Sequence, residues 1–203
     1  SNKNLIKFNE QHKLIYKKSK DDIDGRFLYD QEDITDDYQV HIIYILASDS
    51  KDKKYDVKGV IEDIVLTGNK YLNSKTDQQQ FRLDLTKEGK VDVSFIRVDK
   101  TKKKINRIKN AADYFVAEAV MRGFYNPKKL YAILYQERYK EEWGQIGGIM
   151  YFGEEGPVEI IMGITYLEAN PLDEGFHPHV HELIHALGFV QLCAPGAIIK
   201  DNR

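Results

Sequence analysis

The sequence predicts a mixed α/β domain, because three kinds of apolar pattern alternate along its 203 residues. Some apolar runs are continuous and as long as a buried strand, others recur at helical spacing, and two alternate with polar residues. Hydrophobic residues make up 42% of the chain and charged residues 31%, as in ordinary soluble globular proteins. A chain of this length can bury a sizeable core without a structural metal, so a bound metal is expected to serve chemistry.

The first half of the chain predicts a strand, a helix and a hairpin, in that order. Residues 40–46 (VHIIYIL) form a continuous apolar run, which is typical of a strand buried on both faces. Residues 57–72 carry apolar side chains at helical spacing and predict a long amphipathic helix. Residues 81–85 and 91–95 alternate around Glu88-Gly89-Lys90, which predicts a hairpin.

The second half predicts another long helix, three strands and a histidine-rich helix. Apolar spacing over residues 105–120 predicts the helix, and Gly123 and the Asn126-Pro127 step end it. Further apolar segments predict strands at 130–135, 147–152 and 158–167. The expected domain thus has a mixed sheet, two long helices and a further helix after the last strand.

Two parts of the chain differ in composition. Residues 1–37 are polar and are expected to form an N-terminal extension packed on a domain of residues 38–203. The opening Ser1-Asn2 is typical of a cleaved expression tag. A native export signal could have been removed before this start, so the lack of one in this sequence says little about where the protein is located.

Charge and cysteine content argue against several partners. The 30 basic and 32 acidic side chains give a net charge of −2, which offers no electrostatic reason to expect nucleic acid or an anionic membrane. No apolar stretch approaches the roughly 20 residues that span a bilayer. Cys193 is the single cysteine of the sequence, so no disulfide can form within it.

The segment FHPHVHELIHALGFVQ, residues 176–191, carries the candidate chemistry. Pro178 can open a helix, on which His181 and His185 project from one face because they are four residues apart. Two neutral imidazoles at this separation can bind one Zn²⁺. Glu182 follows the first histidine and is placed to take a proton from a water molecule and pass it to a leaving amine. The alternative is a helix with two surface histidines that bind no metal.

The segment HELIHALGFV resembles the start of the metzincin signature, HExxHxxGxx followed by His or Asp. In that family the glycine, here Gly188, lets the chain turn so that a third ligand returns to the metal. Gln191 occupies the third-ligand position and departs from the pattern, since a glutamine amide is a poor zinc ligand. The resemblance implies a twisted mixed sheet and a zinc-peptidase site.

The wider sequence, including residues 79–98 and 181–197, is similar to a bacterial group of metzincin-like peptidases whose third histidine lies further on. The resemblance then implies a third ligand beyond Arg203 and a catalytic domain truncated at its C-terminal end. Asp201, His177 and His179 are weaker candidates, and we expect the last two to face solvent. His41 lies in a predicted strand and is interpreted as a core histidine.

The expected function is that of a zinc-dependent endopeptidase acting on peptide or protein substrates. The resemblance implies an edge strand above the metal, for which residues 147–151 are the candidate because small residues let a peptide backbone approach. Two alternatives stay open: an inactive metzincin-like binding domain, and a zinc amidase acting on non-protein amides. The resemblance also implies a secreted or cell-envelope location, whereas the sequence indicates neither an oxyanion-stabilising residue nor an oligomeric state.

Overall fold

The computed structural model describes residues 20–153, 156–169 and 174–188, and these form a mixed α/β domain as predicted. The strands are β1 (Gln39–Leu46), β2 (Val93–Arg97), β3 (Lys129–Tyr135), β4 (Gly144–Gly153) and β5 (Gly156–Tyr166). The helices are α2 (Val60–Lys75), α3 (Lys102–Ile105), α4 (Ala111–Val120) and α5 (Phe176–Ala186), and a 3-10 turn, η1 (Leu167–Ala169), follows β5. Within these ranges, no helix has both the length and the apolar character needed to cross a membrane.

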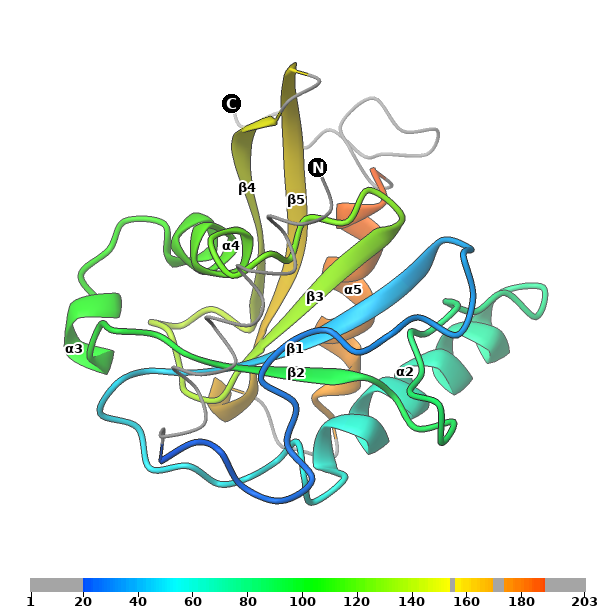
Figure 1. The fold of residues 1–203 in the computed structure, drawn as a ribbon, viewed down its shortest axis with the longest axis horizontal. Helices are drawn as coiled ribbons and strands as arrows, with labels where there is room; N and C mark the ends of the chain where they lie inside the picture. The colour runs from blue at the N-terminus through cyan, green and yellow to red at the C-terminus, as the bar shows by residue number, and fades with distance from the viewer. Residues whose placement is uncertain (1–19, 154–155, 170–173, 189–203) are drawn as a thin grey trace, which may run out of the picture.

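The five strands form one mixed sheet in the order β2-β1-β3-β5-β4 (Figure 1). β1 pairs in parallel with both β2 and β3, and β3 pairs in parallel with β5. β4 is antiparallel to β5 and forms one edge of the sheet. The sheet thus ends on a strand that runs against its neighbours.

Helices cover both faces of the sheet, which explains the continuous apolar run of β1 (Figure 1). Ile43 and Ile45 belong to the core cluster on the α4 side. Ile42 and Tyr44 belong to the cluster on the other side, where α2 and α5 pack. All eight residues of β1 are buried, as expected for a central parallel strand.

Two predicted elements differ from the structure. The helix expected over residues 105–120 is divided into α3 and α4, because Asn110 adopts an extended conformation and its Oδ1 accepts from the N–H of Ala112 as an N-cap. The expected hairpin is reduced to a turn with an isolated antiparallel bridge between Leu85 and Val91. The second run of that hairpin instead forms β2 and pairs in parallel with β1.

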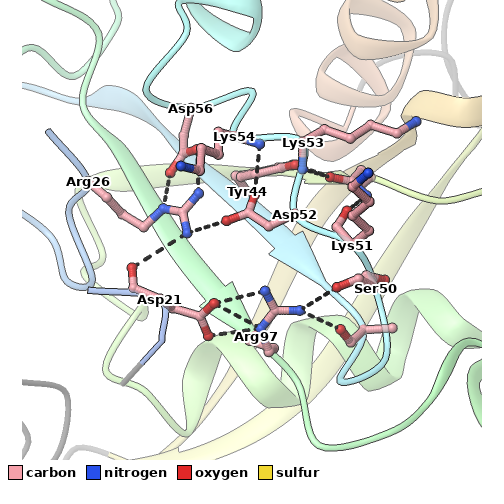
Figure 2. Close-up of polar contacts among 12 residues, drawn as sticks. Asp21, Arg26, Tyr44, Ser50, Lys51, Asp52, Lys53, Lys54, Asp56 and Arg97 are labelled. Atoms are coloured by element: carbon pink, nitrogen blue, oxygen red, sulfur yellow. Dashed lines mark hydrogen bonds and ion pairs between the residues drawn. The ribbon is translucent and has the colours of Figure 1, made fainter. Parts of the chain in front are cut away.

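The segment of residues 20–30 is tied to β2 and to the loop after β1 by two arginines (Figure 2). Arg26 stacks on the Phe95 ring at 3.7 Å and donates to the carboxylates of Asp52 (2.7 Å) and Asp56 (2.5 and 2.8 Å). Arg97 donates to Asp21 in return, with distances of 2.8–3.0 Å. These contacts hold the segment against the outer side of β2.

Candidate active site

The helix α5, which carries the predicted site, packs between β5 and α2 because two glycines let it approach closely. A Cβ atom at Gly163 of β5 would lie 2.9 Å from the backbone carbon of Glu182. A Cβ atom at Gly68 of α2 would lie 2.9 Å from Cγ2 of Val180. Val180 and Leu183 are buried at these contacts and anchor the helix. The opposite side of the helix is left for the histidine pair.

The structure brings His181 and His185 together, as the spacing predicted. Their Nε2 atoms lie 2.9 Å apart, and the two rings meet edge to face with centroids 4.5 Å apart. A tetrahedral zinc at 2.0–2.1 Å from both nitrogens would separate them by about 3.3 Å, so a small ring rotation suffices to admit it. Partial burial and, to a smaller extent, the nearby His185 lower the pKa of His181. This favours the neutral imidazole that a metal needs.

Glu182 lies beside the histidine pair and against the sheet. Its side chain contacts Gly144 of β4 closely: a Cβ atom there would lie 2.6 Å from Cγ and 2.7 Å from Oε1 of Glu182. The residue is buried, with 8% of its surface exposed. Burial, with a smaller contribution from Glu142, raises the pKa of Glu182 to about 7. A carboxyl group held in this way is suited to accept and return a proton.

Gly144→Ala is expected to displace the Glu182 carboxylate and to lower both stability and peptide hydrolysis. The added methyl group would also lie 2.9 Å from the backbone oxygen of Ile164, which cannot move aside easily. Overpacking of this kind costs about 1–3 kcal/mol, which a thermal unfolding experiment detects. Gly148→Ala is the matched control, because its methyl group would be 3.6 Å from the nearest atoms, at Ile160 and Ile161. Equal effects of the two variants would contradict this role of Gly144.

The helix α5 ends at Ala186, and Gly188 follows with a left-handed φ of 82° and a hydrogen bond from its N–H to His185 O (2.9 Å). The resemblance assigns a turn to this glycine, and the left-handed φ is compatible with one, while the return of a third ligand stays a prediction. Gln191, Asp201 and the chain up to Arg203 lie outside the described residues. Within residues 20–153, 156–169 and 174–188, no third His, Cys, Asp or Glu joins the pair.

The two other candidate histidines of α5 do not approach the pair. His177 is exposed and stacks edge-on against Tyr71, with ring centroids 4.8 Å apart. His179 was expected to face solvent, and this is wrong: it is 2% exposed and packs against α2 at Gly68. Its burial lowers its pKa to about 4. The helix is amphipathic with a register that turns His179 inward and His181 outward, so His179 is a core histidine.

The edge strand expected at residues 147–151 lies within β4, which is an edge of the sheet. Ile146 and Met150 of this strand are exposed, with 41% and 54% of their surfaces accessible. Gly147 packs on α4, since a Cβ atom there would lie 2.5 Å from the backbone carbon of Ala112. The backbone N–H of Gly148 donates to the Asp113 carboxylate at 3.0 Å.

A second cluster that could hold a metal ion lies around His41 of β1 and was not predicted. It consists of Asp30, His41, Asp84 and Asp92, whose candidate ligand atoms all lie within 4.8 Å of one another. His41 Nδ1 lies 2.8 Å from Asp84 Oδ2, and its Nε2 lies 3.0 Å from Ser94 Oγ. The interpretation of His41 as a core histidine with satisfied ring nitrogens is confirmed, since it is fully buried.

Lys129 supplies a positive charge to this cluster. Its ammonium donates to Asp30 and Asp84 at 2.7 Å and lies 2.5 Å from Asp33. Burial alone would raise the pKa of Asp84, but the hydrogen bonds from His41 and Lys129 outweigh it and hold that pKa below its usual value. Asp92 lacks a charged donor of this kind: its Oδ2 accepts from the backbone N–H of Gln31 at 2.9 Å, and its Oδ1 is buried without a hydrogen-bond partner in the described part of the chain. The cluster therefore contains more carboxyl groups than cationic groups to pair with them.

Asp92→Asn is expected to raise the free energy of unfolding at neutral pH. Burial, helped by the carboxylates of Asp30 and Asp84 and opposed by His41 and the Gln31 N–H, raises the pKa of Asp92 to about 6. Because this exceeds the unfolded value of about 3.9, ionisation of Asp92 lowers stability as the pH rises from about 4 through about 6. The amide removes this effect, so we expect a gain of about 3 kcal/mol above pH 7 and none below pH 4.

Urea unfolding at pH 7.5 and pH 4 measures this difference, with Asp77→Asn, at an exposed turn, as control. A loss of stability at pH 7.5 would contradict the prediction and would indicate that Asp92 faces a bound cation in the native protein.

Comparisons with known proteins give remote similarity to solved structures. No protein-family model matches the sequence, and no curated protein matches it. A wild-type crystal structure of OgpA from Akkermansia muciniphila is similar over 83% of this chain and 52% of its own, with 15% identity and a TM-score of 0.48. A second wild-type crystal form covers 84% and 53%, with 15% identity and a TM-score of 0.45. Catalytically inactive OgpA in complex with an O-glycopeptide, glycodrosocin, covers 83% and 52%, with 14% identity and a TM-score of 0.42.

The chain thus spans about half the length of these proteins. TM-scores and identities this low do not establish a shared activity. The resemblance to metzincins therefore stays a prediction from the motif and its geometry.

Proposed function

We propose that this chain is a zinc-dependent endopeptidase in which His181 and His185 bind the metal and Glu182 is the general base. The observation that supports this most is the 2.9 Å approach of the two Nε2 atoms on α5, next to a buried carboxylate. Two surface histidines that bind no metal would not require a buried glutamate beside them. The combination fits the chemistry that HExxH helices perform.

The residues present fit zinc as two of its ligands, since imidazole is a preferred zinc ligand and both rings are accessible. A bound zinc would supply Lewis-acid activation of a water molecule and of the scissile carbonyl. The third ligand is proposed to come from the chain after Gly188, in line with the resemblance.

Glu182 would accept the proton of the attacking water and deliver it to the leaving amine. Its carboxylate is held between α5 and Gly144, so it needs little reorganisation to do so. The adjacent open edge of β4 would position an extended peptide by backbone pairing.

The test is zinc content after dialysis, measured by mass spectrometry of the metal, for the wild type and for His181→Ala, His185→Ala and His177→Ala. In a chain extended past Arg203, which would include the third ligand that the resemblance implies, one zinc per chain is expected for the wild type and for His177→Ala, and none for the other two variants. Absence of zinc from this chain and from a chain extended past Arg203 would overturn the proposal.

Cleavage is then assayed on a panel of peptides with and without O-glycans, because one of the similar solved structures holds an O-glycopeptide. Zinc binding without cleavage of any peptide would instead favour a binding domain, and cleavage of small amides alone would favour an amidase.

A further inference from the structure

The open edge of β4 is closed at one point by a side chain of α4. Asp113 Oδ1 accepts a hydrogen bond from the backbone N–H of Gly148 at 3.0 Å. An N–H on the open edge of a sheet is the group that an added strand would use. One of the edge donors of β4 is therefore already bound within the chain.

The pairing of β4 with β5 shows which backbone groups face the open edge. In an antiparallel pair, alternate residues turn their N–H and C=O groups toward the neighbouring strand or away from it. Trp143 O accepts from the N–H of Tyr166 at 3.0 Å, and Gly144 pairs with Thr165 at the next position of the register. Gly148 donates to Asp113 rather than to β5, so Gly144, Ile146 and Gly148 turn their backbones outward.

Asp113 is held firmly at this position. Its second oxygen, Oδ2, accepts from Asn110 Nδ2 at 2.7 Å, and Asn110 is also the N-cap of α4. The preceding residue, Ala112, packs against Gly147 so closely that a Cβ atom at Gly147 would lie 2.5 Å from the backbone of Ala112. Helix α4 thus fixes the carboxylate at Gly148 by contacts on both sides of it.

The closed point lies near the proposed catalytic residue. Gly144 contacts Glu182, and Gly148 is four residues further along β4, or about 14 Å away for an extended strand. The outward backbone groups of Gly144 and Ile146 lie between them, and no loop or side chain of residues 20–153, 156–169 and 174–188 forms a hydrogen bond with these groups. The stretch from Gly144 to Gly147 is therefore the part of the edge next to Glu182 that a peptide can pair with.

We propose that Asp113 is a positioning residue that stops peptide pairing on β4 at Gly147 and so sets how far an extended substrate can bind along this strand. The substrate class, an extended peptide, rests on the proposed function. The stop at Gly148 rests on the Asp113 contact alone. Residues of a bound peptide that extend past Gly147 therefore add nothing to its binding affinity.

The experiment measures binding of capped valine-threonine peptides of two to about eight residues to the Glu182→Gln protein, which prevents cleavage. Affinity is expected to rise with length and then to reach a plateau. In the Asp113→Ala, Glu182→Gln double variant the plateau is expected to move to longer peptides. The next hydrogen bond should tighten binding about fivefold, because a net backbone hydrogen bond contributes roughly 1 kcal/mol.

Two further variants distinguish the effect of Asp113 on peptide pairing from a general disruption of α4. Asn110→Ala removes the helix cap and the bond to Asp113 Oδ2 but keeps Oδ1 available to Gly148, so its plateau should match that of the parent protein. Asp113→Asn keeps an acceptor oxygen and should do the same. An unchanged plateau in Asp113→Ala, or a plateau that moves equally in Asn110→Ala, would overturn the proposal.

Backbone amide hydrogen exchange, read by NMR, keeps this result distinct from the proposed function. Peptide binding should protect the amides of Gly144 and Ile146. Protection of these amides together with the shifted plateau supports the stop at Gly148, even if the wild type cleaves no peptide and the peptidase proposal fails. Absence of such protection with every peptide would overturn the stop, even if the wild type hydrolyses peptides.

Discussion

Replacing Glu182 with glutamine is expected to lower kcat for peptide hydrolysis by about 10²–10⁴-fold while one zinc per chain is retained. Glutamine has nearly the same shape, so it can occupy the space between α5 and Gly144. It cannot accept a proton from water, and the histidine pair one residue before it and three after it is left intact. Steady-state kinetics and zinc content of the same preparation provide the measurement.

Glu159→Gln is the matched control, because Glu159 is exposed on β5 and contributes the same change of charge. Its kcat is expected to equal that of the wild type. Activity retained in Glu182→Gln would show that another group accepts the proton, and zinc lost from this variant would show that Glu182 supports the metal instead.

Lys129→Met is expected to lower the free energy of unfolding by about 3–5 kcal/mol at neutral pH. The ammonium is buried and contacts Asp30, Asp33 and Asp84, and its removal leaves these carboxylates without a cation. Asp84 is 1% exposed and cannot turn to water, whereas the side chains of Asp30 and Asp33 are about one-third exposed and can. We therefore expect the segment that carries Asp30 and Asp33 to become sensitive to proteolysis in the variant.

Lys128→Ala is the control for this substitution. Lys128 contacts Asp36 by an ion pair at the surface, where the aspartate side chain is 93% exposed. Surface pairs of this kind contribute 0–1 kcal/mol. A loss of stability in Lys129→Met no larger than that in Lys128→Ala, measured by urea unfolding at pH 7.5, would contradict the role assigned to the buried ammonium.

Much of the fold could be predicted because central strands and helix spacing are local signals. The run VHIIYIL at residues 40–46 is apolar at every position because helices cover both faces of β1, and this pattern is visible in the sequence. The division between α3 and α4 was not predicted, since apolar spacing continues through it. It depends on one side-chain cap at Asn110. The pairing of β2 with β1 depends on contacts between distant segments, which an alternating pattern does not specify.

The site was predictable to the same extent. His181 and His185 meet because helix geometry places residues four apart on one face, and this requires no tertiary information. The second cluster comes from four separate segments, so no local spacing predicts it; it consists of Asp30, His41, Asp84 and Asp92. A partial signal exists in LDL and VDV, where Asp84 and Asp92 sit between apolar residues of the two alternating runs. An aspartate at an inward strand position is costly unless it has a partner.

Residues 20–30 cover the outer side of β2, so the two edge strands of the sheet differ in the accessibility of their backbone groups. Phe27 forms a parallel bridge with Ser94, and its carbonyl accepts from the N–H of Phe95 at 2.8 Å, so the outer side of β2 is covered there. β4, at the other border, still exposes backbone groups next to the proposed site. Within the part of the chain that the structure describes, strand-to-strand association of two copies would therefore use β4 on both. Such a pair would occupy the surface on which a peptide would lie, so self-association and substrate binding would exclude each other.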